Sequence, residues 1–318
     1  MTTMEGDMKT DWDIIIIGGG TAGLSAAQYG ARANLRTLLI EEMAPGGLTL
    51  IISDLENYPG FPEPIQGFEL AQRFAEQAEK FGAEIMSASV TSIEKQENHF
   101  TVEAGDKKIT APAVILATGA QHRKLDIPGE QEFSGKGVSY CATCDGPLFK
   151  KKKLLVVGGG DAACDEAMFL SKITDSITLV HRRDRFRAQP SLAQRVQADD
   201  HIEVRFNHEV KEIKGDSQVR SAVLYDNKKD STYEEEFDAV FVFIGSIPQT
   251  GLVPDAEKDE TGYIITDQCM HTSIPGLFAV GDVRNTPFRQ IVVGAGDGAV
   301  ASHCAAQFID ELKGQSYD

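Results

Sequence analysis

Two cysteines separated by two residues, Cys141-Ala-Thr-Cys144, are followed directly by an acid, Asp145. Two thiols at this spacing close a small, reducible disulfide that can exchange with the disulfide of another protein. The group lies between two glycine-rich segments, at residues 18–23 and 158–163, and each is typical of a dinucleotide site. A dithiol between two dinucleotide sites predicts an electron relay that ends on a disulfide.

The cysteine pair also allows two simpler interpretations, half of a zinc site or a pair of inert buried thiols. A zinc site needs two further ligands at a sensible spacing, and Cys164, Cys269 and Cys304 are scattered along the chain. We therefore favour redox use of Cys141 and Cys144, and interpret the other three as small core or surface residues. The seven histidines form no metal-ligand cluster, so we predict no metal site.

The first glycine segment, Gly18-x-Gly20-x-x-Gly23, stands between a β-branched run at 14–17 and a stretch of helical composition at 21–33. The first glycine permits the tight turn, the second admits a pyrophosphate, and the third lets the helix pack closely. A second apolar run at 37–40 ends at Glu41 and Glu42. An acid in this place binds a ribose hydroxyl pair, which predicts FAD or NAD.

The second glycine segment, Gly158-x-Gly160-x-x-Ala163, has the same setting, with apolar runs at 154–157 and 177–180 and a helix expected at about 161–172. The residues after its second run are basic, His181-Arg182-Arg183-Asp184-Arg185-Phe186-Arg187. Guanidinium groups there match a 2′-phosphate by bidentate hydrogen bonds, which favours NADPH. The alternative is a solvated basic stretch without a ligand.

The elements that position these groups occur twice. Apolar runs ending in glycine close each half, at 114–119 and 240–245, and the tail adds one more at 276–282 before a helix expected at 291–312. The simplest arrangement is an α/β protein with two Rossmann-like dinucleotide-binding domains, the second inserted into the first. We expect a discontinuous FAD-binding domain at 1–119 and 249–318 and an NADPH-binding domain with the CxxC at 120–248. Residues 1–11 are expected to be disordered.

Composition limits the class of protein. The chain has 318 residues, 42% of them hydrophobic, and five cysteines, which predicts full cores without a disulfide framework. A formal charge of −17 argues against nucleic acid as a partner, because phosphate backbones require a basic face. The sequence shows neither a signal peptide nor an apolar run of about 18 residues, so we expect a soluble cytoplasmic protein with no membrane partner.

These motifs, in this order, resemble the bacterial-type, low-molecular-weight thioredoxin reductases, a class of pyridine nucleotide-disulfide oxidoreductases. The resemblance runs from about Asp11 to Leu312 and includes Gly46-Gly47, the segment 56–60, Ala117-Thr118-Gly119, the CxxC with its acid, and Gly281-Asp282. It implies an oxidoreductase that is a homodimer and a flavoprotein. The implied reaction passes electrons from NADPH through FAD and the Cys141–Cys144 disulfide to thioredoxin.

The resemblance also assigns residues. In the implied mechanism Cys144 faces the flavin and resolves the mixed disulfide, Cys141 attacks thioredoxin, and Asp145 shuttles the proton. The FAD site would comprise Gly18, Gly20, Thr21, Ala22, Gly23, Glu41, Glu42, Gly46, Gly47, Leu48, Asn57, Val90, Ala117, Thr118, Gly119, Gly281, Asp282, Arg289, Gln290 and Ile291. The NADPH site would comprise Gly158, Gly160, Asp161, Ala162, Ala163, Glu166, His181, Arg182, Arg183, Arg187, Ile244 and Gly245.

Two positions depart from the family pattern. Leu48 replaces the usual glutamine and cannot donate a hydrogen bond to a flavin edge, and Ala162 replaces the usual serine beside the NADPH phosphates. Three alternatives therefore stay open: the same relay with another disulfide acceptor, a donor other than NADPH, and a flavoprotein binding switch that is redox-regulated but has no turnover. A docking surface leaves no short motif, so the sequence does not name the acceptor.

Overall fold

The computed structural model describes residues 10–52, 55 and 57–315, apart from the side chains of Ile51 and Cys144. The chain forms two compact units. The outer unit comprises Met1–Ile51, Leu55–Ala120 and Pro248–Asp318, and the inserted unit comprises Ile52–Asp54 and Gln121–Ile247. Each contains a five-stranded sheet of parallel pairs flanked by helices, so the expected α/β class is confirmed.

The sheet of the outer unit has the strand order β18-β7-β1-β2-β3. Its strands are β1 (Ile14–Ile17), β2 (Thr37–Glu41), β3 (Glu84–Ser87), β7 (Ala113–Leu116) and β18 (Leu277–Ala279). Every residue of β1 and β7 is buried, as expected of central strands covered on both faces. The carboxyl ends of these strands carry the first glycine loop and the segments after β7 and β18.

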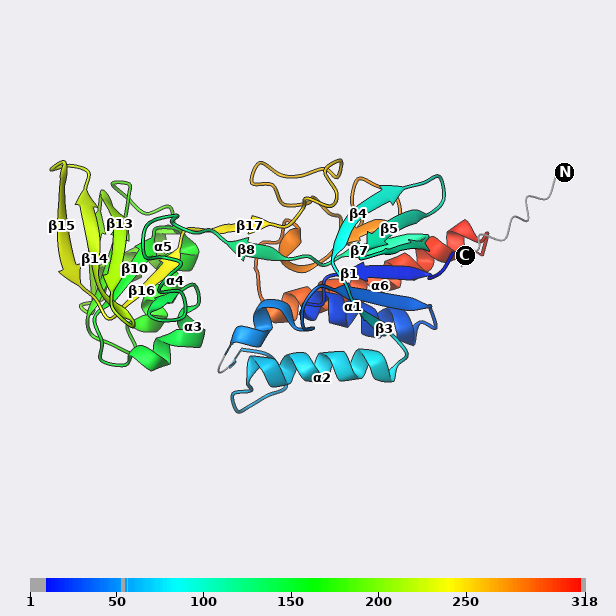
Figure 1. Cartoon of the computed structure of the whole chain (residues 1–318), viewed down its shortest axis with the longest axis horizontal. Helices are drawn as coiled ribbons and strands as arrows, with labels where there is room; N and C mark the ends of the chain where they lie inside the picture. Colours follow the sequence, from blue (N-terminus) through cyan, green and yellow to red (C-terminus); the bar gives the residue numbers. More distant parts are fainter. Residues whose placement is uncertain (1–9, 53–54, 56, 316–318) are drawn as a thin grey trace. The chain divides into compact units, whose positions relative to one another are not determined.

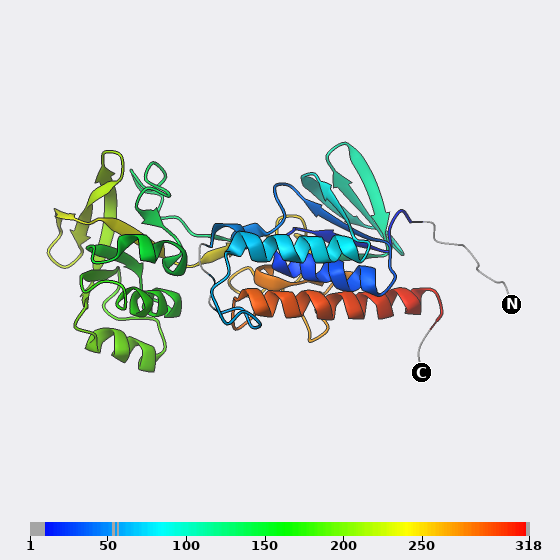
Figure 2. The same ribbon diagram turned by 90° about the horizontal axis from the view of Figure 1, so that it is seen from below.

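Different layers cover the two faces of this sheet. Figure 2 shows α1 (Thr21–Arg32), α2 (Gly67–Lys80) and α6 (Ile291–Leu312) side by side on one face. On the other lies a three-stranded antiparallel sheet of β4 (Val90–Lys95), β5 (Phe100–Ala104) and β6 (Lys107–Ala111) (Figure 1). Alternate residues of β1 enter the two cores: Ile14 and Ile16 pack with the helices, Ile15 and Ile17 with the small sheet.

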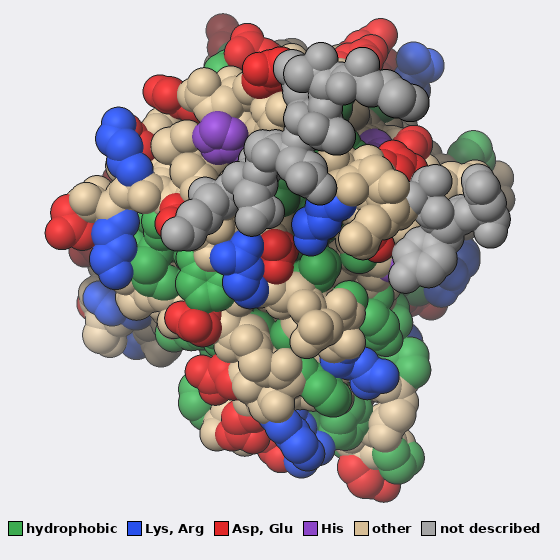
Figure 3. Space-filling view, turned by 90° about the vertical axis from the view of Figure 1, so that its right-hand side faces the viewer, with side chains coloured by type: hydrophobic (Ala, Val, Ile, Leu, Met, Phe, Trp, Pro, Cys, Tyr) green, Lys and Arg blue, Asp and Glu red, His purple; other side chains and the backbone are tan. Residues whose placement is uncertain are grey.

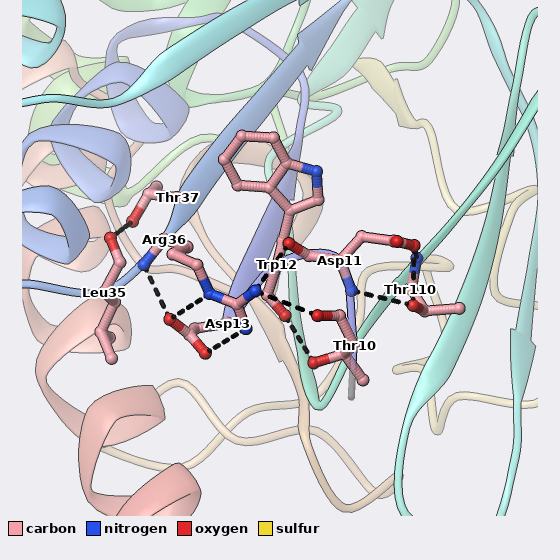
Figure 4. Close-up of polar contacts among 8 residues, drawn as sticks. All are labelled: Thr10, Asp11, Trp12, Asp13, Leu35, Arg36, Thr37 and Thr110. Carbon is pink, nitrogen blue, oxygen red and sulfur yellow. Dashed lines mark hydrogen bonds and ion pairs between the residues drawn. The ribbon is translucent and has the colours of Figure 1, made fainter. Parts of the chain in front are cut away.

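The residues just before β1 are tied to neighbouring strands (Figure 4). Arg36 donates hydrogen bonds to both carboxylate oxygens of Asp13, at 3.2 and 3.0 Å, and to the carbonyl oxygens of Thr10 and Asp11. Asp11 in turn accepts hydrogen bonds from Thr110. Of the segment 1–11 expected to be disordered, residues 10 and 11 are thus held by specific contacts, and 1–9 lie outside the described residues.

The inserted unit repeats the arrangement, with the strand order β12-β11-β10-β16-β9. Its strands are β9 (Val138–Ser139), β10 (Leu154–Gly158), β11 (Ile177–His181), β12 (Ile202–Phe206) and β16 (Ala239–Phe243). The helices α3 (Ala142–Asp145), α4 (Asp161–Leu170) and α5 (Pro190–Ala198) belong to this unit, as does the antiparallel sheet of β13 (His208–Gly215), β14 (Val219–Asp226) and β15 (Ser231–Glu236). Two buried cores lie within it.

The two crossings between the units pair as a two-stranded sheet of β8 (Ala120–His122) and β17 (Ser246–Pro248). On the side of the inserted unit, Arg123 N–H donates to the Gly245 carbonyl oxygen at 2.9 Å. On the side of the outer unit, Gln249 N–H donates to the Gly119 carbonyl oxygen at 2.9 Å. The segment 121–247, which makes up nearly all of the inserted unit, therefore begins and ends at one place in the fold.

On the face shown in Figure 3, acidic and basic side chains are interspersed, and neither sign gathers into a patch. Within the described part of the chain, no helix has both the length and the apolar character needed to cross a bilayer.

Candidate functional site

The first glycine loop joins β1 to α1 and is packed against the protein at two of its three glycines. A Cβ on Gly18 would lie 2.4 Å from the Ala117 carbonyl oxygen, and one on Gly23 would lie 1.9 Å from the Gly18 carbonyl oxygen. A Cβ on Gly20, by contrast, would meet no protein atom within 4 Å. Gly20 is also the residue before the first turn of α1, whose unpaired N–H groups favour an anion. The loop thus leaves open space where a pyrophosphate would bind.

Glu41, at the end of β2, reaches back to the same loop. Its carboxylate accepts hydrogen bonds from Gly19 N–H at 2.5 Å and from Met43 N–H at 3.0 Å. Glu42 is exposed, and Val90 begins β4 just beyond the β3 residue Ser87, which pairs with Glu41. Glu41, Glu42 and Val90 therefore belong to adjacent segments at the carboxyl edge of the sheet.

The Gly46-Gly47 turn lies against the first glycine loop. Gly46 N–H donates to the Gly19 carbonyl oxygen at 2.7 Å, and a Cβ on Gly47 would lie 3.1 Å from the Gly20 Cα. Gly47 opens the 3₁₀ helix η1 (Gly47–Ile51), in which the Leu48 side chain is 47% exposed. An apolar side chain of this size at the edge of the open loop is not part of the core.

Segments far apart in sequence meet beside the start of α6. Asn57 Nδ2 donates to Gln290 Oε1 at 2.9 Å, and the Arg289 guanidinium lies 3.9 Å from the centre of the Tyr263 ring. After β7, Thr118 Oγ1 donates to the Gln249 carbonyl oxygen at 2.7 Å. These contacts fix Asn57, Thr118 and the 289–291 segment within one unit.

The Gly281-Asp282 turn (η3, Gly281–Val283) depends on Asp297 and Arg284, to neither of which the sequence assigns a role. Asp297, buried in α6, accepts hydrogen bonds through Oδ2 from Gly281 N–H and from Arg284 Nη1, both at 3.1 Å. Arg284 also donates to Thr266 Oγ1 at 2.7 Å. An aspartate in a run of small and apolar residues was the available signal, because a buried charge requires a partner.

The second glycine loop copies the first. A Cβ on Gly158 would lie 2.3 Å from the Phe243 carbonyl oxygen, whereas one on Gly160 would meet no protein atom within 4 Å. A Cβ on Gly159 would lie 2.3 Å from His181 Nδ1, so the imidazole covers this loop. Asp161 opens α4 and accepts a hydrogen bond from Gln189 N–H at 2.7 Å. Ala162 is exposed beside it and Ala163 is buried.

The basic segment after β11 folds over this loop, with Arg187 N–H donating to the Gly159 carbonyl oxygen at 2.6 Å. Arg182, Arg183 and Arg187 are exposed and take part in none of the ion pairs within the described residues. A cavity of about 630 Å³ opens here, lined by residues 183–187 and Asn207. Its charge and size suit an anionic ligand.

His181 is only 8% exposed, and its Nε2 is buried without a hydrogen-bond partner. Burial, followed by the charges of the three neighbouring arginines, lowers the pKa of this imidazole, so the ring is neutral. A neutral, buried ring nitrogen without a partner beside an open glycine loop is a polar group that a ligand would satisfy.

Cys141 is disulfide-bonded, and Cys164, Cys269 and Cys304 are free thiols. Ser139 holds the backbone of Cys141, accepting from its N–H and donating to its carbonyl oxygen, each at 3.1 Å. Cys141 Sγ lies 3.3 Å from Thr143 Oγ1. The side chain of Cys144 lies outside the described residues, and Asp145 ends α3, half-buried.

Glu166 connects the disulfide segment to the second glycine loop. It lies on α4 and accepts a backbone hydrogen bond from Ala142, while its Oε2 is buried without a partner. Burial and, secondarily, the charge of Asp165 raise the pKa of Glu166 to about 7. Ile244 and Gly245 follow β16 at the end of the same unit.

Comparison with known proteins gives one consistent answer. Residues 12–307 match the pyridine nucleotide-disulphide oxidoreductase family. A thioredoxin reductase of Treponema pallidum is 55% identical over 96% of this chain and its own full length, and one of Listeria innocua is 44% identical over 95% of each chain. The crystal structure of Lactococcus lactis thioredoxin reductase is 43% identical, covers 95% of this chain and 100% of its own, and has a TM-score of 0.78.

Both glycine loops leave open space at Gly20 and Gly160, where a pyrophosphate would bind, and His181 and Glu166 offer buried polar atoms without partners, so the residues present fit two dinucleotides. The chain therefore belongs to the pyridine nucleotide-disulphide oxidoreductases, among the thioredoxin reductases, enzymes that work with FAD and NADPH.

Proposed function

We propose that this enzyme takes electrons from NADPH and reduces the disulfide of thioredoxin or a thioredoxin-like protein through Cys141 and Cys144. The observation that carries the proposal is the disulfide at Cys141 in the same unit as the arginine-lined second glycine loop. When bound, NADPH supplies a hydride, and FAD accepts it and delivers two electrons to the disulfide. We further propose that the protein is a cytoplasmic homodimer.

The outer unit would hold FAD. Gly20 and the first turn of α1 would bind the pyrophosphate, and Glu41 would bind the adenosine ribose. The other positions assigned to FAD lie in this unit, and several are already joined by hydrogen bonds, such as that between Asn57 and Gln290. Leu48 would present an apolar side chain to the ligand and offers no hydrogen bond.

The inserted unit would hold NADPH. Gly160 and the first turn of α4 would bind the pyrophosphate, Arg182, Arg183 and Arg187 the 2′-phosphate, and the neutral His181 Nε2 a hydroxyl of the nucleotide. Burial raises the pKa of Glu166 to about 7, so a substantial protonated fraction persists at neutral pH, and that form would donate a hydrogen bond through its buried carboxyl to the carboxamide end of the ligand.

The chain's own thiols would complete the exchange. The Cys141 thiolate attacks the acceptor disulfide, one acceptor sulfur leaves, and the mixed disulfide is resolved when Cys144 attacks Cys141. Two thiols are then oxidised to a disulfide and two acceptor sulfurs are reduced. Asp145, at the end of α3, would take the proton that a thiol loses and return it when the disulfide is reduced.

An anaerobic titration tests donor, cofactor and acceptor separately. Addition of NADPH should bleach the flavin absorbance of the purified enzyme, and oxidised thioredoxin should restore it. Cys141→Ser should still be bleached by NADPH but should lose at least a hundredfold in thioredoxin turnover, while Cys164→Ser should retain the wild-type rate. Failure of NADPH to bleach the flavin would exclude it as the donor. Bleaching without reoxidation by thioredoxin would point to another acceptor or to a binding switch.

A further inference from the structure

Two of the three free cysteines, which the sequence places far apart, meet in the outer unit. Cys304 lies on α6, and Cys269 lies in a turn at 267–271 just before β18. The two thiols share a side-chain hydrogen bond, and both pack on the same core cluster, with Met270 and Phe278 among its members. They are therefore a dithiol, although each looks like an isolated core residue in the sequence.

The backbone on both sides of the pair is fixed. Asp267 Oδ1 accepts hydrogen bonds from Cys269 N–H and His271 N–H, each at 2.9 Å, and Met270 N–H donates to the Asp267 carbonyl oxygen. On α6, Ala301, Cys304 and Ala305 occupy one stripe that faces the core. These contacts hold the backbone at Cys269 and place Cys304 on the core-facing side of α6.

We propose that Cys269 and Cys304 are an oxidation site at which hydrogen peroxide forms a disulfide that ties α6 to the 267–271 turn. The site goes beyond the proposed thioredoxin reduction and does not rest on it, because it belongs to the outer unit whereas Cys141 belongs to the inserted one.

The two thiols have different roles. Cys269 is partly exposed, so peroxide reaches it, whereas Cys304 is 4% exposed. Burial, and then the contact with Cys269, raises the pKa of Cys304 to about 12, so Cys304 stays a thiol while its neighbour reacts.

The Cys269 thiol loses its proton, the thiolate attacks one peroxide oxygen, and the O–O bond breaks. Hydroxide leaves and takes up that proton as water, which gives a sulfenic acid. The Cys304 sulfur then attacks the Cys269 sulfur, the S–O bond breaks, a second water leaves, and the S–S bond forms. Two thiols lose two electrons and one peroxide gains them.

The test uses the FAD-loaded, full-length Cys141→Ser/Cys144→Ser variant, in which the proposed exchange pair is absent. The protein is reduced with dithiothreitol, desalted, treated with equimolar hydrogen peroxide, denatured and alkylated. The free thiols should fall by two. Trypsin should release peptides 259–284 and 290–313 as one linked species, two hydrogens lighter than their sum, which dithiothreitol separates.

Three further variants in that background assign the roles. Cys304→Ser should give no linked peptide and a dimedone adduct at Cys269, Cys269→Ser should give neither, and Cys164→Ala should keep the link. If Cys304→Ser does not fold, Cys304→Ala serves in its place, with flavin retention as the check of folding. Absence of the linked peptide from folded, peroxide-treated protein, or a dimedone adduct at Cys304 in the Cys269→Ser variant, would overturn the proposal.

Discussion

Glu166 is a carboxyl whose environment disfavours its charge. Its Oε2 is buried without a partner and Asp165 is adjacent in sequence, which together raise its pKa to about 7. Such a group is costly to the free protein and is retained at sites that use a protonated acid near neutral pH.

The first prediction follows from this shift. Because the folded protein binds the Glu166 proton more tightly than the unfolded chain, wild-type stability should fall as pH rises from the ordinary value near 4.5 to about 7. Glu166→Gln cannot ionise, so it should become more stable than wild type above pH 7, by about 3 kcal/mol. Urea denaturation without NADPH at pH 5 and pH 8 measures the difference. Asp165→Asn should show a smaller gain, and equal pH dependence in wild type and Glu166→Gln would refute the assignment.

The second prediction concerns the choice of nucleotide. Each guanidinium contact to a 2′-phosphate contributes about 1.5–3 kcal/mol, so Arg182→Ala/Arg187→Ala should raise the KM for NADPH by about 10²–10⁴-fold and leave that for NADH nearly unchanged. The matched control is Arg220→Ala, an exposed arginine on β14 that pairs with Asp216 and does not line this cavity. Steady-state assays with both nucleotides give the answer, and an equal loss with NADH would contradict a phosphate contact.

Single residues differ in how readily the sequence reveals them. The roles of Gly18, Gly20 and Gly160 could be predicted from their spacing, because this glycine spacing is typical of a tight turn between a strand and a helix. Asp297 stands out as an acid among small and apolar residues, but no local pattern identifies its partners Gly281 and Arg284. Ser139 acts through backbone atoms of Cys141, which side-chain patterns do not reveal. The Cys269–Cys304 contact was missed for the same reason, because only the fold brings a turn and a helix together.

At the scale of elements, the strand–loop–helix units could be predicted from the sequence. Both faces of their strands are buried, so each strand is a continuous apolar run that is easily recognised. The runs at 14–17, 37–40, 154–157 and 177–180 are confirmed as strands, and the long terminal helix at 291–312 is confirmed as α6. The helix expected to reach about residue 172 ends at Leu170. The strand β15 is largely exposed, so it carries no apolar alternation from which it could have been recognised.

The third prediction separates two functions of the first loop. Gly20→Ala adds a methyl group where no protein atom lies, at a φ of −64° that alanine accepts, so the apo-protein should keep its stability while FAD binding falls by at least tenfold. Gly23→Ala should instead destabilise the fold by about 1–3 kcal/mol, because its methyl group meets the Gly18 carbonyl oxygen. Thermal melts and fluorescence titration with FAD distinguish the two. A large loss of stability in Gly20→Ala would mean that the space is not reserved for a ligand.

At the scale of the whole molecule, the inserted unit contains everything that an independent domain requires. It has its own parallel sheet and two buried cores, and its ends are joined by the hydrogen bond between Arg123 and Gly245.

The fourth prediction is that residues 121–247 fold alone. The fragment should unfold in one cooperative transition and bind NADP⁺, because its cores share no residue with the outer unit. A shorter fragment that starts at residue 150 lacks Phe133, Val138 and α3 and should be largely unfolded. Circular dichroism and calorimetric titration test both. A disordered 121–247 fragment would show that the outer unit is needed for folding.

The single place at which the inserted unit begins and ends has a consequence for the gene. The codons for residues 121–247 are consecutive in the coding sequence. In the folded protein, the two segments that flank these residues lie side by side, because β8 pairs with β17. Recombination at two points within that gene can therefore exchange the whole nucleotide-donor module and its thiols in one event. A library of chimaeras cut at these two positions would transfer donor preference and thiol chemistry between relatives while the flavin-binding scaffold of the recipient stays intact.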